Sequence, residues 1–154
     1  MIITKEIGID MGHRVPNHNS KCRNIHGHRY RIEVGVDDKV IQEKGTSSEG
    51  MVIDFTDLKK IMMKEIDERL DHGFMCYRGD IALAAKFTAL KNEFDMKIIF
   101  VDFIPTAENI AKYLFDLLEV NLKAVGIQLH HVRIWETPSS SATYKKAFAH
   151  DFGK

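Results

Sequence analysis

Residues 26–37 have the sequence HGHRYRIEVGVD, in which two imidazoles precede a regular alternation of polar and apolar side chains. In an extended chain successive side chains point to opposite faces, so His26 and His28 project to one side together with the residues listed next. These are Tyr30, Ile32, Val34 and Val36. We therefore expect a half-buried strand over residues 29–37, with two histidines at its head.

A second alternating run ends at His13. The apolar residues on the face of His13 are Ile3, Ile7, Ile9 and Met11, and Lys5 is the exception on that face. If the two runs pair as neighbouring strands, His13, His26 and His28 converge at one end of a sheet. Three nitrogen ligands leave the fourth tetrahedral position of a zinc ion open, as in catalytic rather than structural zinc sites. The sequence thus predicts a metal centre that does chemistry.

The other histidines are interpreted as surface or structural residues, since a single histidine is more often one of these than a ligand. They are His18, His130, His131 and His150. His130 and His131 are adjacent in a predicted strand, so they face opposite sides and cannot both bind one ion in regular geometry.

Length and composition favour one domain over residues 1–154, long enough to bury a substantial core. Lys plus Arg and Asp plus Glu both number 22, so the overall charge predicts no nucleic acid, membrane surface or polyanionic partner. The first residues do not resemble a signal peptide, and no apolar run approaches membrane-spanning length. We expect a soluble, cytoplasmic protein.

Two stretches have the spacing of amphipathic helices. The first covers residues 55–70, after a turn or loop over 44–50, and Asp54 can serve as its N-cap. The second begins at Pro105-Thr106, where Thr106 can cap and Glu108 places negative charge at the positive end of the helix dipole. Its expected apolar stripe comprises Ile110, Leu114, Leu117, Leu118, Leu122 and Val125, and Gly126 is the expected stop.

A weaker helical pattern covers residues 81–94, and strands are expected over 97–103, 129–136 and 142–149. The last two flank a turn-rich segment, residues 137–141. The order is strand, strand, helix, helix, strand, helix, strand, strand. This order indicates an α+β fold, an antiparallel sheet with helices packed on one face.

Cys22 lies between Lys21 and Arg23, four residues before His26. Neighbouring cations and a metal both favour the thiolate, which can act as a base or a nucleophile. The alternatives are a fourth zinc ligand or an inert thiol. Cys76 has no comparable setting and is interpreted as structural.

Asp71 and His72 follow the end of a predicted helix and form a candidate acid-base pair, because a nearby carboxylate can orient an imidazole. The alternative is a surface histidine that interacts with the helix dipole. Glu136 ends the apolar row of Val132 and Ile134, where a buried carboxylate needs a partner. A flat heterocycle with two adjacent N–H donors is one such partner, and simple exposure at the strand end is the alternative.

These pieces together resemble the 6-pyruvoyltetrahydropterin synthase superfamily, and most closely its 6-carboxytetrahydropterin synthase branch. The matching segments are His13-Arg14, Cys22-Arg23-Asn24-Ile25-His26-Gly27-His28, Val52-Ile53-Asp54-Phe55, Leu58-Lys59, Leu70-Asp71-His72, Pro105-Thr106-Ala107-Glu108-Asn109 and Trp135-Glu136-Thr137. Their order and combination are specific, although no single segment is decisive.

The resemblance implies site roles for individual residues. The zinc ligands would be His13, His26 and His28; the catalytic residues Cys22, Asp71 and His72; and the substrate-binding residues Glu136, Thr106 and Glu108. The three residues between Cys22 and His26 resemble the carboxy branch, because animal pyruvoyl enzymes have a longer spacer there. A folate branch with glutamate in place of the cysteine fits less well.

The resemblance also implies the tunnelling fold (T-fold), whose sheets join into a barrel in a trimer, with two trimers stacked as a hexamer and active sites between subunits. The implied substrate is 7,8-dihydroneopterin triphosphate, converted to 6-carboxy-5,6,7,8-tetrahydropterin, acetaldehyde and triphosphate on the route to queuosine-type 7-deazaguanines. Biopterin-type pyruvoyl synthesis and a non-catalytic, zinc-stabilised binding module are the alternatives. The long stretch between His72 and Pro105 departs from the shortest family members.

Overall fold

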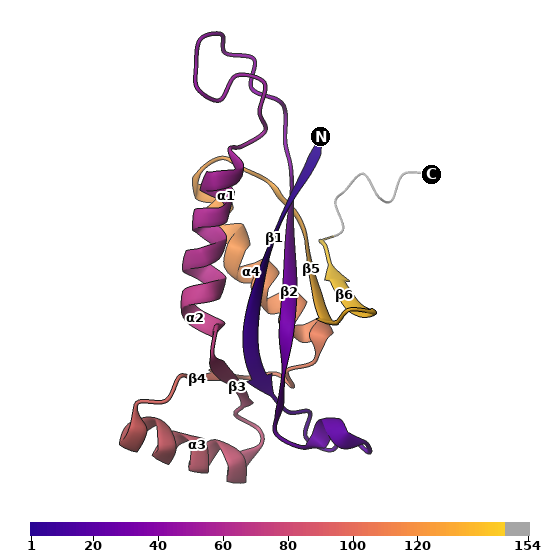
Figure 1. Ribbon diagram of the computed structural model, residues 1–154, viewed down its shortest axis with the longest axis vertical. Coiled ribbons are helices and arrows are strands. Elements are labelled where there is room, and N and C mark those ends of the chain that lie inside the picture. The colour runs from indigo at the N-terminus through magenta and orange to yellow at the C-terminus, as the bar shows by residue number, and fades with distance from the viewer. Residues whose placement is uncertain (147–154) are drawn as a thin grey trace.

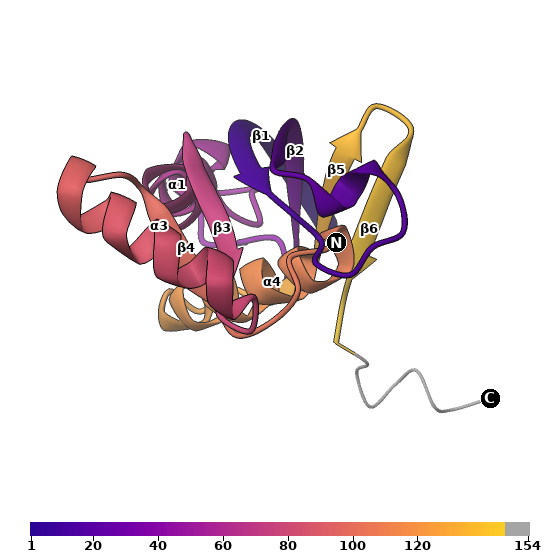
Figure 2. The same cartoon turned by 90° about the horizontal axis from the view of Figure 1, so that it is seen from below.

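A computed structural model of the chain describes residues 1–146, which form a six-stranded sheet with its helices on one face (Figures 1 and 2). The strands are β1 (Ile2–His13), β2 (His26–Asp37), β3 (Gly73–Tyr77), β4 (Ile98–Val101), β5 (Leu129–Thr137) and β6 (Ser140–Tyr144). The helices are α1 (Phe55–Met62), α2 (Glu68–Leu70), α3 (Ile81–Phe94) and α4 (Ala107–Ala124), with a 3-10 turn η1 (Lys21–Arg23) and a π-helical turn η2 (Met63–Asp67). The strand order is β4-β3-β1-β2-β5-β6.

The first two strands pair as predicted. β1 and β2 are antiparallel over their whole length, and the register runs from Ile2 opposite Asp37 to His13 opposite His26. The covered face of β1 is most buried at its His13 end, and that of β2 is buried from Tyr30 to Val36, so the alternation in the sequence corresponds to a covered and an open face. The strand predicted over 29–37 begins earlier, at His26, because the two histidines also pair with β1.

The sheet is mixed, which corrects the purely antiparallel prediction. β5 and β6 continue the antiparallel pairing beyond β2, but β3 pairs in parallel with β1, and β4 pairs in parallel with β3. β3 was not predicted, because its five residues, GFMCY, directly follow a helix and show no alternation. The parallel β3–β4 pair is connected through α3, as parallel strands require a crossover.

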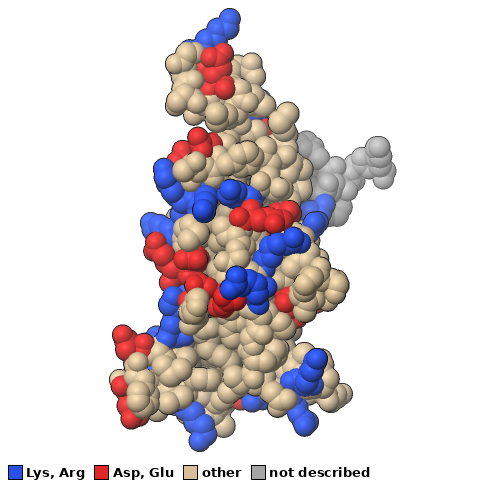
Figure 3. Space-filling model, in the orientation of Figure 1, with Lys and Arg blue, Asp and Glu red and all other residues tan. Residues whose placement is uncertain are grey.

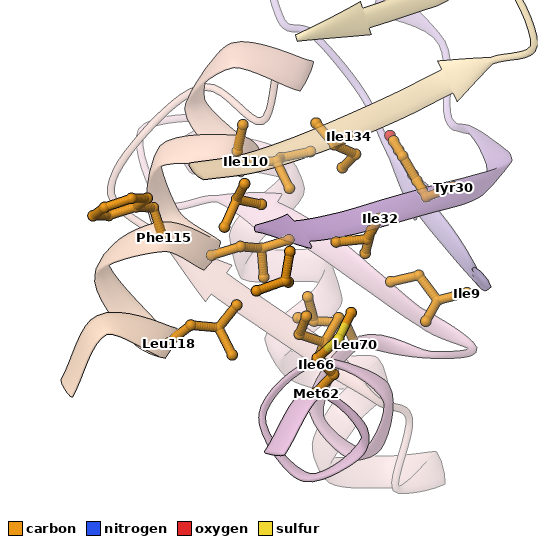
Figure 4. Close-up of a cluster of buried hydrophobic side chains, with 14 of the residues drawn as sticks. Ile9, Tyr30, Ile32, Met62, Ile66, Leu70, Ile110, Phe115, Leu118 and Ile134 are labelled. Carbon is orange, nitrogen blue, oxygen red and sulfur yellow. The ribbon is translucent and has the colours of Figure 1, made fainter. Parts of the chain in front are cut away.

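The main core lies between the sheet and two helical segments. The segment predicted over 55–70 is helical throughout, with η2 as a π-helical turn between α1 and α2, and its buried residues include Leu58, Met62, Ile66 and Leu70 (Figure 4). Both predicted N-caps are confirmed: Asp54 accepts from the Thr56 N–H at 2.6 Å, and Thr106 from the Asn109 N–H at 3.4 Å. These caps fix where the two helices begin against the sheet.

The buried face of α4 differs in part from the predicted apolar stripe. Val125 is 58% exposed, since it follows the last helical residue, while Phe115, absent from the predicted stripe, is fully buried. Gly126 adopts a positive φ of 77° just past the helix, in agreement with its predicted role as the stop.

Residues between His72 and Pro105 form a small second cluster. Cys76, Phe87 and Ile98 are its buried members, and the rings of Phe74 and Phe87 stack with centroids 4.5 Å apart. The helix predicted over 81–94 is confirmed as α3, and the strand predicted over 97–103 is the shorter β4. The additional length of this chain therefore has its own packing.

β6 starts and ends earlier than the strand predicted over 142–149. Ser140 already pairs with Thr137, so only Pro138 and Ser139 make the turn, and residues 145 and 146 are not in the strand. Residues 147–149 of the predicted strand, and His150, lie outside the described residues.

The face of the sheet opposite the helices carries ion pairs across neighbouring strands, Asp10 with Arg29, Glu6 with Arg31 and Glu33 with Arg133. Figure 3 shows acidic and basic side chains gathered on this face. Within residues 1–146, no helix has both the length and the apolar character needed to span a membrane.

Candidate active site

Three histidines converge where β1 ends and β2 begins. Among residues 1–146, His13, His26 and His28 are the group of potential metal ligands whose ligand atoms all lie within 4.8 Å of one another. The antiparallel register places His13 opposite His26, and the alternation of β2 places His28 on the same face. The convergence predicted from strand pairing is therefore confirmed.

Backbone carbonyls orient two of these rings. His13 Nδ1 lies 2.7 Å from the Pro105 carbonyl oxygen, and His26 Nδ1 lies 2.8 Å from that of Asn24. Because a carbonyl only accepts hydrogen bonds, each Nδ1 carries the proton and each Nε2 keeps its lone pair. A second hydrogen bond of this kind is the usual way in which a protein orients a metal-binding histidine.

The Nε2 atoms of His13 and His28 are buried and have no hydrogen-bond partner among the described residues. Burial lowers the pKa of both imidazoles, against the opposing charge of Glu136, so both rings favour the neutral form. Buried nitrogen atoms without partners are costly unless something binds them. Three neutral imidazole nitrogens suit a zinc ion with one open position.

Glu136 lies beside this cluster, at the end of the covered face of β5. Its Oε1 is 3.4 Å from His13 Nε2, 3.8 Å from His28 Nε2 and 3.4 Å from the Tyr30 hydroxyl. The side chain is 26% exposed, so it is neither buried like Ile134 nor free in solvent. The hydrogen-bond donor that the sequence did not reveal is thus the Tyr30 hydroxyl, and Oε1 of Glu136 also lies beside two of the clustered histidines.

Tyr30 is the residue at this site that sequence reasoning missed. It is fully buried, and its ring meets those of His13 and His28 edge-on, with centroids 5.9 and 5.5 Å apart. Burial and the charge of Glu136 raise the pKa of the phenol, which therefore remains a hydrogen-bond donor. Its signal was its place two residues after His28 on the same strand face.

A cavity of about 320 Å³ adjoins the cluster and brings together residues from four segments. Its lining includes His13, Cys22, Thr106, Glu108 and Glu136. It also includes His18, predicted to be a surface residue, which is exposed and accepts a hydrogen bond from the Ser20 N–H. Cys22 lies in η1, and its carbonyl accepts from the Val15 N–H at 2.9 Å, which closes the loop between β1 and β2.

Asp71 and His72 form the predicted pair, with Asp71 Oδ2 2.6 Å from His72 Nδ1. The second oxygen of Asp71 accepts from the Asp10 N–H at 2.8 Å, and these two contacts, the backbone one first, lower the pKa of the carboxyl. The pair does not line the cavity of Cys22. His72 instead lines a separate hollow of about 480 Å³ with Asp10 and Arg29, and its side chain is 78% exposed.

His130 and His131 depart from the predicted geometry. The β2–β5 register shifts between Gly35 and Val36, which leaves His130 in an irregular position, and the Nδ1 atoms of the two rings lie 2.8 Å apart. His131 packs across Gly35, where a Cβ atom would stand 2.2 Å from its ring, and its Nε2 is 3.0 Å from Glu33. Cys76 is buried, as expected of a structural thiol.

The curled sheet, the one-sided helices and the histidine cluster define an α+β protein with a candidate three-histidine metal centre. Solved structures share this fold: an uncharacterized protein of Wolinella succinogenes has a TM-score of 0.78 at 24% identity over 96% of this chain and 98% of that one. The 6-pyruvoyl tetrahydropterin synthase of Caenorhabditis elegans has a TM-score of 0.65 at 25% identity, over 96% of both chains.

The chain belongs to the 6-pyruvoyl tetrahydropterin synthase family, whose model matches residues 2–147. A Haemophilus influenzae protein named 6-carboxy-5,6,7,8-tetrahydropterin synthase is 34% identical over 94% of this chain and 98% of its own length. A protein of the same name from Aquifex aeolicus is 32% identical over 94% of this chain and 97% of its own length. The chain is accordingly an enzyme of this family, with a pterin synthase function.

Proposed function

We propose that this enzyme converts 7,8-dihydroneopterin triphosphate to 6-carboxy-5,6,7,8-tetrahydropterin, acetaldehyde and triphosphate, in the cytoplasm and on a route to 7-deazaguanines. The observation that carries the proposal is the cavity in which Cys22 and Glu136 lie beside His13, a member of a three-histidine cluster in which two buried Nε2 atoms have no hydrogen-bond partner among the described residues. The names of the curated relatives agree with this activity.

His13, His26 and His28 would hold a zinc ion, because their ligand atoms lie within 4.8 Å of one another and Nδ1 contacts leave the Nε2 atoms of His13 and His26 as lone-pair sites. When bound, zinc supplies Lewis acidity toward side-chain oxygens of the substrate. A closed structural site would need a fourth protein ligand. Cys22 lies outside the histidine group and beside a cavity, which argues against the non-catalytic zinc module.

Cys22 is proposed to remove a proton from the substrate side chain, and the Asp71–His72 pair to pass protons during triphosphate loss and carbon–carbon cleavage. Asp71 holds its imidazole at Nδ1, which leaves Nε2 of His72 as the atom that exchanges protons. Since His72 is exposed and lies away from the cavity of Cys22, the pair would act on the site of a neighbouring copy in a trimer or hexamer.

Glu136, Thr106 and Glu108 would bind the pterin ring. The carboxylate of Glu136 can accept two N–H bonds from an amino-pyrimidine edge, a paired and charge-assisted contact. Thr106 and Glu108 stand at the start of α4 and line the same cavity, where backbone and side-chain groups can meet the ring.

Product identification tests this proposal. Zinc-loaded enzyme is incubated with 7,8-dihydroneopterin triphosphate, and the products are separated and identified by mass. We expect 6-carboxytetrahydropterin with equimolar acetaldehyde, whereas a 6-pyruvoyl product without acetaldehyde would establish the biopterin-type alternative. The Cys22→Ala protein, prepared with the same metal content, is the control for contaminating activity.

A further inference from the structure

The hydroxyl of Tyr30 has an unusual position for a fully buried group. Tyr30 is enclosed by the main core, where Figure 4 shows its side chain with the hydroxyl end directed toward β5. A buried hydroxyl needs a hydrogen-bond partner, and the acceptor here is Oε1 of Glu136, at 3.4 Å. The ring itself contacts two of the three clustered histidines.

The contacts of Glu136 are uneven between its two oxygens. The three neighbours of Oε1 are Tyr30, His13 and His28, at 3.4, 3.4 and 3.8 Å. Tyr30 is the recorded donor to Oε1, whereas Nε2 of His13 is a lone-pair site because Nδ1 of that ring carries the proton. Tyr30 is therefore the group that can hold Oε1 without competing for the metal.

We propose that Tyr30 is a positioning residue for Glu136: its hydroxyl donates to Oε1 and keeps the carboxylate at the edge of the cavity, ready for a ring with paired N–H donors. The inference rests on the proposed function, since it assumes that Glu136 binds the ring. The hydrogen bond from Tyr30 fixes the position of Oε1 from within the core.

The main test compares Tyr30→Phe with wild type in binding neopterin, followed by the fluorescence of the pterin. Phenylalanine keeps the buried ring and removes only the donor. We expect zinc content and thermal stability close to wild type, with neopterin affinity about 5- to 10-fold weaker, the size of one modest hydrogen bond. In turnover, KM should rise more than kcat falls, since Tyr30 does not touch the reacting atoms.

A matched control is Tyr113→Phe, the same change in a tyrosine of α4. The ring of Tyr113 packs on that of Phe103, with centroids 5.6 Å apart. This variant should bind neopterin like wild type. Equal weakening by both variants would overturn the inference, because the effect would then not depend on contact with Glu136.

A double-mutant cycle with Glu136→Gln separates this inference from the proposed function. If Tyr30 acts through Glu136, Tyr30→Phe weakens binding in the wild-type background and has little further effect in the Glu136→Gln background. Unchanged affinity in Tyr30→Phe, with Glu136→Gln still weak, overturns only the role of Tyr30. Unchanged affinity in Glu136→Gln overturns the ring-binding role on which both depend.

A second substitution keeps the test decisive if Tyr30→Phe does not fold or does not hold zinc. Site-specific incorporation of a fluorotyrosine at position 30 retains the hydroxyl and nearly the same volume, but makes it a stronger donor. We expect an altered neopterin affinity at full zinc content, and no change from the same replacement at Tyr113. An unchanged affinity at position 30 would overturn the inference.

Discussion

The two chemical groupings of this enzyme are built in opposite ways. The histidine cluster is buried at His13, which is only 1% exposed, and half-buried at His26 and His28, and the full-length pairing of β1 and β2 holds it in register. The Asp71–His72 pair stands on a turn after α2, with His72 at a positive φ of 56° and 78% exposed. One grouping is part of the core edge, and the other projects from the surface.

The two groupings also differ in how many of their polar atoms have hydrogen-bond partners. The cluster leaves two buried Nε2 atoms without partners, whereas both oxygens of Asp71 are already engaged, one by the Asp10 N–H and one by His72. A site whose buried atoms lack partners is preorganised to bind a ligand, and here one chain supplies all of its residues. The pair on the surface is already hydrogen-bonded, and under the proposed function it acts only on a molecule that lies beside it.

The largest expected effect is on the buried grouping. His28→Ala removes one of the three proposed zinc ligands, so stoichiometric zinc and turnover should be lost together. Metal content by atomic absorption and product formation by mass measure this. His130→Ala, a histidine outside the cluster, should keep its zinc, and full zinc in His28→Ala would exclude His28 from the ligand set.

Cys22→Ala tests whether the cavity beside the cluster is catalytic. We expect a folded protein with full zinc and turnover lower by about 10²–10⁴-fold, the usual effect of deleting a proton-transfer group. Turnover and zinc are measured on the same preparation. Loss of zinc would instead support Cys22 as a fourth ligand.

A mixing experiment tests the exposed grouping. Cys22→Ala and His72→Ala should each be nearly inactive, but co-assembled oligomers should regain activity, because some sites combine an intact Cys22 of one copy with an intact His72 of another. Random mixing at equal amounts gives about a quarter of intact sites in a closed ring. Turnover of the co-refolded mixture is compared with the two unmixed variants, and no recovery in verified mixed oligomers would place Asp71 and His72 outside the shared site.

The smallest effect concerns the pH dependence of stability. The pKa of Asp71 is lowered from 3.8, so its contribution to the free energy of unfolding is fully present above that pH and is lost as the pH falls through the lowered value. Asp71→Asn keeps an oxygen for the Asp10 N–H but carries no charge. Urea unfolding from pH 3 to 7 should show a wild-type advantage that is constant above about pH 5 and shrinks below pH 4. An advantage independent of pH would mean that the charge of Asp71 adds nothing.

Several parts of this architecture follow from local pattern. The alternation in residues 26–37 and before His13 placed three histidines on one face, and the capping residues Asp54 and Thr106 marked where two helices begin. These features depend on neighbours within a few residues, so they can be predicted without knowing the contacts between distant parts of the chain.

Two other features could not be predicted from local pattern. β3 was missed because five apolar residues carry no period, and its parallel pairing depends on the crossover through α3. The approach of His130 to His131 depends on a register shift opposite Gly35, which no strand-periodicity argument anticipates.

The sequence by itself determined the ligand face, the helix starts and the family resemblance. Only the tertiary structure decided that the Pro105 carbonyl contacts His13 Nδ1, that the Tyr30 hydroxyl contacts Glu136, and that Asp71 and His72 lie apart from the cavity of Cys22. The physical reason is separation along the chain: Tyr30 and Glu136 are 106 residues apart, and packing of whole elements, rather than any local preference, sets the contact between such residues.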